Sequence, residues 1–202
     1  MAVDEVLMEN AIHPLLRVYD WADPWATFGY SQSEDTVAQV WAGWKLVRRW
    51  TGGGVVIHDK DWTFSLIVPR AHPVAKLRPA QSYREFHEAM AVALKDCGIR
   101  SELAGLMPPG RLGACFSNGT VCHDLLDQQG AKICGGAQRR TRQGVLHQGS
   151  LQKVNVPDDF GLRYARALAG DVRHYTLPEN QVRRAEELTE KKYATAEWMK
   201  RL

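Results

Sequence analysis

Residues 48–59 read R-R-W-T-G-G-G-V-V-I-H-D, with three consecutive glycines between two runs that have strand character. Three glycines continue a helix or a strand poorly, so they predict a turn that joins two strands. Their N–H groups, beside Arg48 and Arg49, could approach a carbonyl, phosphate or carboxylate oxygen of a ligand. A flexible hairpin turn with a solvated pair of arginines explains the same pattern. The spacing is not that of a phosphate-binding P-loop.

Strand patterns continue on both sides of this stretch, interrupted by helical patterns. Strands are predicted at 15–21, 27–32, 44–50, 55–58, 62–68, 114–116, 123–126, 131–134 and 144–153. Helices are predicted at 2–11, 82–97, 158–169 and from Pro178 close to Leu202, the second with a capping box of Ser82 and Glu85. Strands and helices do not alternate regularly, which favours an α+β fold with a mostly antiparallel, mixed sheet flanked by helices.

Length and composition limit the class of protein. A chain of 202 residues with 45% hydrophobic and 24% charged residues is typical of one globular domain. A net charge of +3 gives no argument for a nucleic-acid partner, and no apolar run approaches the roughly 20 residues of a membrane span. The four cysteines show neither a C-x-x-C pair nor a metal-finger spacing, so we expect reduced thiols, no metal site and a cytoplasmic location.

A second glycine-containing segment, 130–140, reads G-A-K-I-C-G-G-A-Q-R-R. It places Lys132 in a predicted strand just before a predicted Gly-Gly turn, where the amine could reach a bound carbonyl or phosphate. An exposed lysine on an edge strand is the ordinary alternative. The stretch 146–151, L-H-Q-G-S-L, alternates apolar and polar residues and is also consistent with a half-buried strand.

One cysteine lies where a nucleophile could be accessible. Cys115 ends a predicted strand in G-A-C-F-S-N-G, and a nearby lysine or histidine would favour its thiolate. A buried structural cysteine is the alternative. Cys97 lies on the apolar stripe of a helix and is expected in the core, while spacing leaves Cys122 and Cys134 undecided.

Taken in order, these segments resemble the biotin/lipoate protein ligase and lipoyl/octanoyltransferase superfamily, and most closely its LipM-type octanoyltransferases. The likeness covers nearly the whole chain. It rests on the T-G-G-G-V-V-I-H-D run, the Cys115-Phe116 pair, the G-A-K-I-C-G-G-A-Q segment and the closing K-Y and E-W pairs. The strand 144–151 is similar to the family's G-V-x-x-Q-H-G-S strand, with His147 and Gln148 in exchanged order. The resemblance implies the class II aminoacyl-tRNA synthetase/biotinyl-protein-ligase-like fold.

The resemblance also implies a reaction and a set of site residues. Cys115 would take an octanoyl group from octanoyl-acyl carrier protein as a thioester, and Lys132 would favour the thiolate and hold the acyl carbonyl. A lysine of a lipoyl-carrier domain, such as the glycine cleavage H protein, would then accept the group as an amide, without ATP or another cofactor. Substrate-binding residues would be Arg49, Thr51, Gly52, Gly53, Gly54, His58, Gly135, Ala137, Gln138, His147, Gly149 and Ser150.

Further expectations concern the acyl chain, the partner and the extent of the domain. Val55, Val56, Ile57, Phe64 and Leu66 could line an acyl tunnel or belong to the core, and Arg139, Arg140 and Arg142 could guide an acidic carrier or be solvated. We expect a monomer with one catalytic domain over 1–202. Compared with the family, this domain is trimmed at the N-terminus and in the C-terminal helical region.

Two other functions remain open. An ATP-dependent lipoate–protein ligase would use the glycine segment and Lys132 to hold an acyl-adenylate with ATP and Mg²⁺. Ligases of this kind usually carry H-D-x-G-N, whereas residues 58–62 here read H-D-K-D-W. A non-catalytic protein that only binds an acyl group or a carrier is the second alternative, against which Cys115, Lys132 and His58 argue.

Overall fold

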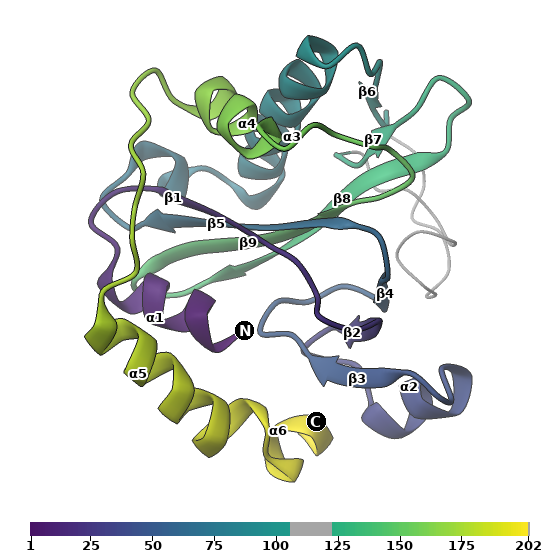
Figure 1. Cartoon of the computed structure of the whole chain (residues 1–202), viewed down its shortest axis with the longest axis vertical. Helices are drawn as coiled ribbons and strands as arrows, with labels where there is room; N and C mark the ends of the chain where they lie inside the picture. Colours follow the sequence, from purple (N-terminus) through teal and green to yellow (C-terminus); the bar gives the residue numbers. More distant parts are fainter. Residues whose placement is uncertain (106–122, 202) are drawn as a thin grey trace.

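The computed structural model describes residues 1–105 and 123–201. Its main sheet consists of β1 (Leu15–Tyr19), β5 (Trp62–Pro69), β6 (Glu102–Leu103), β7 (Leu125–Leu126), β8 (Lys132–Arg140) and β9 (Gly144–Leu151). These strands follow the order β1-β5-β9-β8-β7-β6, and every neighbouring pair is antiparallel. Figure 1 shows helices on both faces of this sheet and a second, smaller sheet below it.

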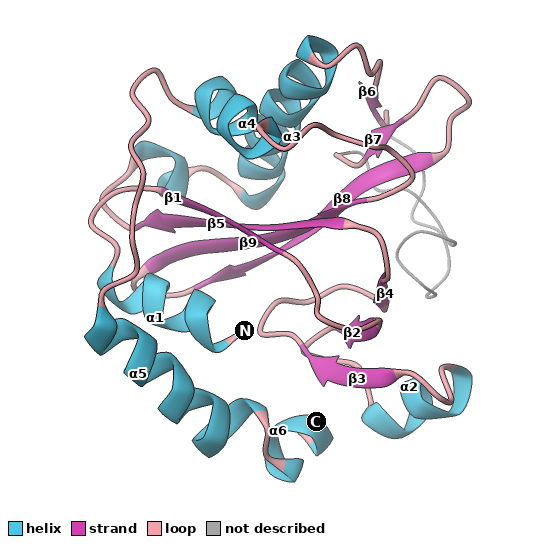
Figure 2. Ribbon diagram, viewed as in Figure 1, coloured by secondary structure: helices cyan, strands magenta, loops and turns pink. Residues whose placement is uncertain are grey.

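The helices are α1 (Ala2–Asn10), α2 (Glu34–Val40), α3 (Pro79–Asp96), α4 (Phe160–Leu168), α5 (Glu179–Leu188) and α6 (Ala196–Lys200), with a 3₁₀ turn at Pro73–Lys76 and a π-helical turn at Thr189–Tyr193. Helices α3 and α4 cover one face of the main sheet, and α1 and α5 lie on the other (Figure 2). The predicted α+β fold with a mostly antiparallel sheet between helices is therefore confirmed.

Strand β5 shows why both faces of the main sheet are covered. Its side chains alternate, so Phe64 and Leu66 enter the core under α3 and α4, whereas Ile67 packs with Leu7 of α1 and Leu146 of β9 on the opposite face. All three β5 side chains are less than 5% exposed. A strand with two apolar faces needs a layer on each side.

The second sheet contains β2 (Trp25–Phe28), β3 (Lys45–Arg48) and β4 (Val56–His58), in the order β3-β2-β4. Strand β2 is parallel to β3 and antiparallel to β4. The turn at 59–61 leads from β4 of the small sheet into β5 of the main sheet. The two strands predicted on either side of this turn are therefore present, and they belong to different sheets.

Arg48, at the end of β3, holds the C-terminal helix against the small sheet. Its guanidinium is fully buried and donates to the carbonyl oxygens of Trp198 at 2.9 Å and Met199 at 2.7 Å. It also donates to the carbonyl oxygens of Tyr30 and Gln32, at 2.6 and 2.7 Å. The arginine that the sequence suggested as a source of charge for a ligand is therefore a structural clamp.

The helix predicted at 82–97 begins earlier, at Pro79, and the capping box of Ser82 and Glu85 does not form. Proline is favoured in the first turn because that position needs no N–H partner. Ser82 is buried inside this turn, and its hydroxyl oxygen lies 2.9 Å from the carbonyl oxygen of Pro79.

Three further elements differ from the prediction. The segment 131–140 continues as β8 through Gly135 and Gly136, which pair with Ser150 and Gly149 of β9 and form no turn. The single helix predicted from Pro178 is divided into α5, the π-helical turn and α6. Helix α2 is not predicted, because its seven residues are too few to show a clear period. The strand predicted at 114–116 lies outside the described residues.

Candidate active site

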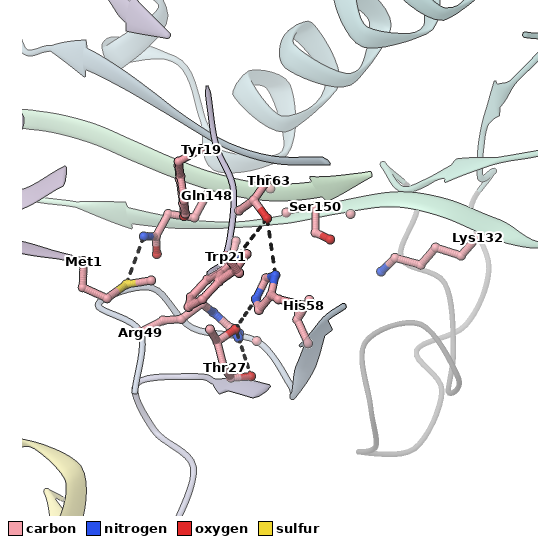
Figure 3. A pocket seen from close by; sticks show the side chains of 16 residues that line it. Met1, Tyr19, Trp21, Thr27, Arg49, His58, Thr63, Lys132, Gln148 and Ser150 are labelled. Carbon is pink, nitrogen blue, oxygen red and sulfur yellow. Dashed lines mark hydrogen bonds between the residues drawn. The ribbon is translucent and has the colours of Figure 1, made fainter. Parts of the chain in front are cut away.

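A pocket lies where the small sheet meets the main sheet. The space between its walls is about 490 Å³, part of it open to solvent. In Figure 3 the Lys132 side chain extends toward Ser150, while Met1, Tyr19 and Gln148 lie at the other end. The lining residues are Met1, Tyr19, Trp21, Thr27, Arg49, Gly53, Val56, His58, Thr63, Lys132, Gly135, Gly136, Ala137, Gln148, Gly149 and Ser150.

Arg49 fixes the triple-glycine loop at one wall of the pocket. It donates to the carbonyl oxygens of Gly52 at 2.9 Å and Gly54 at 2.7 Å, and to the hydroxyl of Thr27 at 2.7 Å. Gly53 has φ +89°, a backbone conformation that other residues rarely adopt. The loop is therefore held rigidly by the arginine beside it, and Gly53 presents backbone to the pocket.

His58 belongs to a buried hydrogen-bonded network that joins the two sheets. Its Nδ1 lies 2.7 Å from the carboxylate of Asp61, and its Nε2 lies 2.8 Å from the hydroxyl of Thr27. The same Asp61 oxygen accepts from the hydroxyls of Thr63 at 2.9 Å and Ser150 at 2.5 Å. Since the carboxylate can only accept, Nδ1 carries the proton and Nε2 accepts from Thr27 in the neutral ring. Both ring nitrogens of His58 are thus used inside the protein.

Alternation along β9 decides which of its polar residues reach the pocket. Gln148 and Ser150 face it; Gln148 accepts from the Thr51 hydroxyl at 2.7 Å and donates to Asp4 at 2.7 Å. His147 points to the opposite face, where its ring packs against Phe86 at a centroid distance of 5.1 Å. The exchanged order of His147 and Gln148 therefore places glutamine, not histidine, at the pocket.

Lys132 opens β8 at the pocket and is paired with a carboxylate. Its Nζ lies 2.8 Å from Oδ2 of Asp124, and the two side chains are 9% and 1% exposed. A Cβ atom on Gly135 would lie only 2.5 Å from Cε and 2.6 Å from Nζ of Lys132. The glycine thus leaves the space that the lysine side chain occupies.

The structure brings many of the predicted site residues to the pocket, but not all. Those that line it are Arg49, Gly53, His58, Lys132, Gly135, Ala137, Gly149 and Ser150. Those that do not line it are Thr51, Gly52, Gly54, Gln138 and His147. Val56, expected as a possible acyl wall, also lines it, and the lining residues that were not predicted are Met1, Tyr19, Trp21, Thr27, Thr63, Gly136 and Gln148. Trp21 and Thr27 belong to no sequence motif, and they reach the pocket because Trp21 lies between β1 and β2 and Thr27 lies on β2.

The described cysteines do not face the pocket. Cys134 is fully buried in the main core, and burial raises the pKa of its thiol. Cys97, at the end of α3, packs against the same core as expected. Cys115 and Cys122 lie outside the described residues.

Most of the expected acyl-wall residues, and two of the three arginines at 139–142, are engaged within the protein. Val56 lines the pocket, whereas Phe64 and Leu66 lie in the main core and Val55 in the core of the small sheet. Arg139 stacks on the Trp50 ring and donates to its carbonyl oxygen. Arg140 donates to the carbonyl oxygen of Ala75 and the hydroxyl of Ser82, and Arg142 is exposed.

Residues 1–105 and 123–201 contain neither a metal-ligand cluster nor a helix suited to a membrane. No three of their histidine, cysteine and acidic side chains are grouped so as to hold a metal ion. None of the helices in this part of the chain has the length and apolar character needed to cross a membrane.

Comparison with known proteins identifies the family of this chain. Residues 1–191 match the family described as the lipoyl protein ligase A/B catalytic domain. The chain therefore belongs to this family, as the sequence motifs predict.

The curated relatives include two octanoyltransferases named LipM. The one from Macrococcus caseolyticus is 34% identical over 180 residues, and the one from Staphylococcus aureus is 33% identical over 177 residues. Each alignment covers 80% of this chain and 64% of the relative. The chain thus spans less than two thirds of the length of these relatives.

Solved structures show the same fold. A structure of a bipartite lipoate protein ligase and its E2 lipoyl domain from Thermoplasma acidophilum matches with a TM-score of 0.75 and 23% identity, over 100% of this chain and 91% of that one. A lipoate-protein ligase A bound with ATP matches with a TM-score of 0.76 and 24% identity, over 98% and 91%.

Proposed function

We propose that this protein is an octanoyltransferase that moves an octanoyl group from acyl carrier protein, through a thioester on Cys115, to a lysine of a lipoyl-carrier domain. The LipM octanoyltransferases at 33–34% identity support this assignment. The structural observation that carries it is the Lys132 ammonium at one end of a pocket whose walls include Val56, Trp21, three glycines and one alanine of β8 and β9.

The proposed first step is thioester exchange. The Cys115 thiolate attacks the carbonyl carbon of octanoyl-acyl carrier protein, a new C–S bond forms, and the carrier leaves as its thiolate. The Lys132 ammonium stabilises both the attacking thiolate and the negative charge that develops on the carbonyl oxygen. The acyl tail runs from Lys132 along the pocket toward Tyr19.

In the second step the neutral amine of the acceptor lysine attacks the acyl-enzyme. An amide C–N bond forms, the C–S bond breaks, and one amine proton returns to the Cys115 sulfur. One thioester replaces another in the first step, and an amide replaces a thioester in the second. The sequence of steps is therefore downhill without ATP.

The pocket-lining residues of the predicted set hold the substrate in this proposal. Gly53, Gly135, Ala137 and Gly149 contribute backbone and small side chains to the pocket wall, and His58 and Ser150 supply a polar wall. Thr51, Gly52, Gly54, Gln138 and His147 act indirectly, by holding those residues in place.

The partners and the cellular setting belong to the same proposal. The acceptor is a lipoyl-carrier domain such as the glycine cleavage H protein, and the enzyme acts as a monomer without a cofactor, metal or nucleic acid. Because the thioester requires Cys115 as a reduced thiol, we place the reaction in the cytoplasm.

The test is intact-mass spectrometry of the protein after incubation with octanoyl-acyl carrier protein. Wild type should gain one octanoyl group, and Cys115→Ser should gain none and should lose octanoyl transfer to an apo lipoyl domain by at least about a hundredfold. Cys97→Ser is the matched control and should behave as wild type, because Cys97 only packs on the core.

Two outcomes would reject the proposal. A Cys115→Ser variant that modifies the lipoyl domain at the wild-type rate rules out the cysteine thioester. Modification that starts from free octanoate and demands ATP instead identifies a lipoate–protein ligase.

A further inference from the structure

Lys132 does not stand alone at the pocket, because Asp124 forms a short ion pair with it. The 2.8 Å separation and the side-chain exposures of 9% and 1% describe two charges almost removed from water. Desolvation of both groups offsets much of their attraction, so such a pair contributes little to stability by itself. Its place at the pocket end points to a role in the reaction.

The strands around the pair fix the position of Asp124 and leave space for the Lys132 side chain. Asp124 comes directly before β7, and its carbonyl oxygen accepts from the N–H of Ala104 at 2.8 Å. Lys132 and Gly135 lie on β8, and a Cβ on Gly135 would come within 3.2 Å of Oδ1 of Asp124 as well as meeting the lysine. Any larger residue at position 135 would displace the ammonium group.

The described histidine, tyrosine and cysteine side chains near Asp124 are neutral at pH 7. Burial lowers the pKa of His87 on α3 to about 4 and also lowers the pKa of His123, so both rings are neutral at pH 7. Burial raises the pKa values of Tyr83 and Cys134, which are therefore also neutral. Within the described residues, the ion-pair partner of Asp124 is Lys132.

We propose that Asp124 is a positioning residue, which keeps Lys132 protonated and aimed at the acyl carbonyl during the transfer. This inference rests on the proposed function. The Asp124 carboxylate stays ionised and forms no bond to substrate, and Lys132 retains its proton in both steps. An uncharged Lys132 would stabilise neither the thiolate nor the developing oxyanion.

The experiment measures the rate of octanoyl-adduct formation from octanoyl-acyl carrier protein as pH is raised. In Asp124→Asn the ammonium is buried without this anion, so its proton is lost more easily. We expect the rate to fall about tenfold or more, and the alkaline limb of the pH–rate profile to move to lower pH. Asp124→Glu keeps the charge and should restore the alkaline limb.

Labelling with acetic anhydride, followed by peptide mass mapping, reads the state of Lys132 without any turnover. Only a neutral amine reacts, so Lys132 should acetylate roughly tenfold faster or more in Asp124→Asn than in wild type at neutral pH. Glu5→Gln is the control. It removes the 2.6 Å ion pair with Lys192 away from this end of the pocket and should leave the rate, the profile and the labelling of Lys132 unchanged.

Gly135→Ala keeps the inference testable if Asp124→Asn does not fold. Both charges remain, but the new methyl group displaces the ammonium, so the rate should fall while the alkaline limb stays in place. Wild type that forms no adduct overturns the proposed function itself. Wild type that forms the adduct while Asp124→Asn matches it in rate, profile and labelling overturns only the positioning role.

Discussion

At the scale of single residues, three histidine rings gather beside the Lys132–Asp124 pair. His87 and His147 are fully buried with ring centroids 5.3 Å apart, and Tyr83 stacks on His123 at 4.0 Å. The Nδ1 of His87 donates to the carbonyl oxygen of His123. Burial lowers the pKa of all three rings. The folded protein therefore favours the neutral form of all three imidazoles.

This cluster predicts that acid destabilises the protein well before its carboxylates titrate. His87 binds a proton near pH 6.5 when unfolded but only near pH 4 when folded. The unfolded state thus binds more protons between these values, so stability falls as pH drops through the window, by up to about 3 kcal/mol from this group. His87→Gln should flatten the dependence of the free energy of unfolding on pH in this range.

Urea unfolding at several pH values measures the effect. His13→Gln changes an exposed histidine and should retain the wild-type slope. A His87→Gln slope equal to that of wild type would show that His87 titrates alike in both states.

At the scale of elements, β8 shows how neighbouring strands override local preference. Two adjacent glycines predict a turn, since glycine weakens a strand. In the structure β9 pairs with the segment along most of its length, and the two missing side chains leave space for Lys132 at Gly135 and for His147 at Gly136. Glycine is required at both positions because any side chain there would overlap Lys132 or His147.

Gly136→Ala should destabilise the protein by about 1–3 kcal/mol, because its Cβ would overlap the imidazole of His147 in a closely packed core. Thermal and urea unfolding would measure the loss. Gly170→Ala is the matched control, since a Cβ there meets no atom within 4 Å. Equal stability of the two variants would mean that the core can move aside at no cost.

At the scale of the whole molecule, the pocket exists because two sheets are joined along a polar seam. Asp61 forms this seam by accepting from His58 of the small sheet and from Thr63 and Ser150 of the main sheet. Thr51, before the glycine loop, adds a second connection by donating to Gln148 of β9. A substrate in the pocket would contact both sheets at once.

Asp61→Asn should therefore weaken the contact between the two sheets, and it should destabilise the small sheet more than the main sheet. Loss of the charge-assisted bonds should cost about 2–3 kcal/mol in unfolding free energy. In native-state hydrogen exchange, amides of β2 and β4 should exchange faster, while those of β5 and β9 change less. Asp59→Asn, an exposed change in the same turn, should alter neither. A uniform effect over both sheets would show that they open as one unit.

The chain's local patterns were sufficient to predict most elements and the α+β class, and its resemblance to the lipoate ligase and octanoyltransferase superfamily predicted the family and eight of the pocket residues. Hydrophobic periodicity, and glycines that mark the ends of elements, are properties of neighbouring residues, so β1, β5, β9 and α3 could be recognised without coordinates. The triple-glycine loop and Lys132 could be recognised because their motifs are contiguous.

Tertiary structure alone decided how those pieces meet. It turned Arg48 inward to hold α6, brought Trp21 and Thr27 to the pocket, and set Asp124 against Lys132. Each of these contacts joins residues on different elements, and strand order and register determine them. Hydrophobic period and turn chemistry carry no information about which distant side chain will supply a partner, because that depends on the packing of the whole chain.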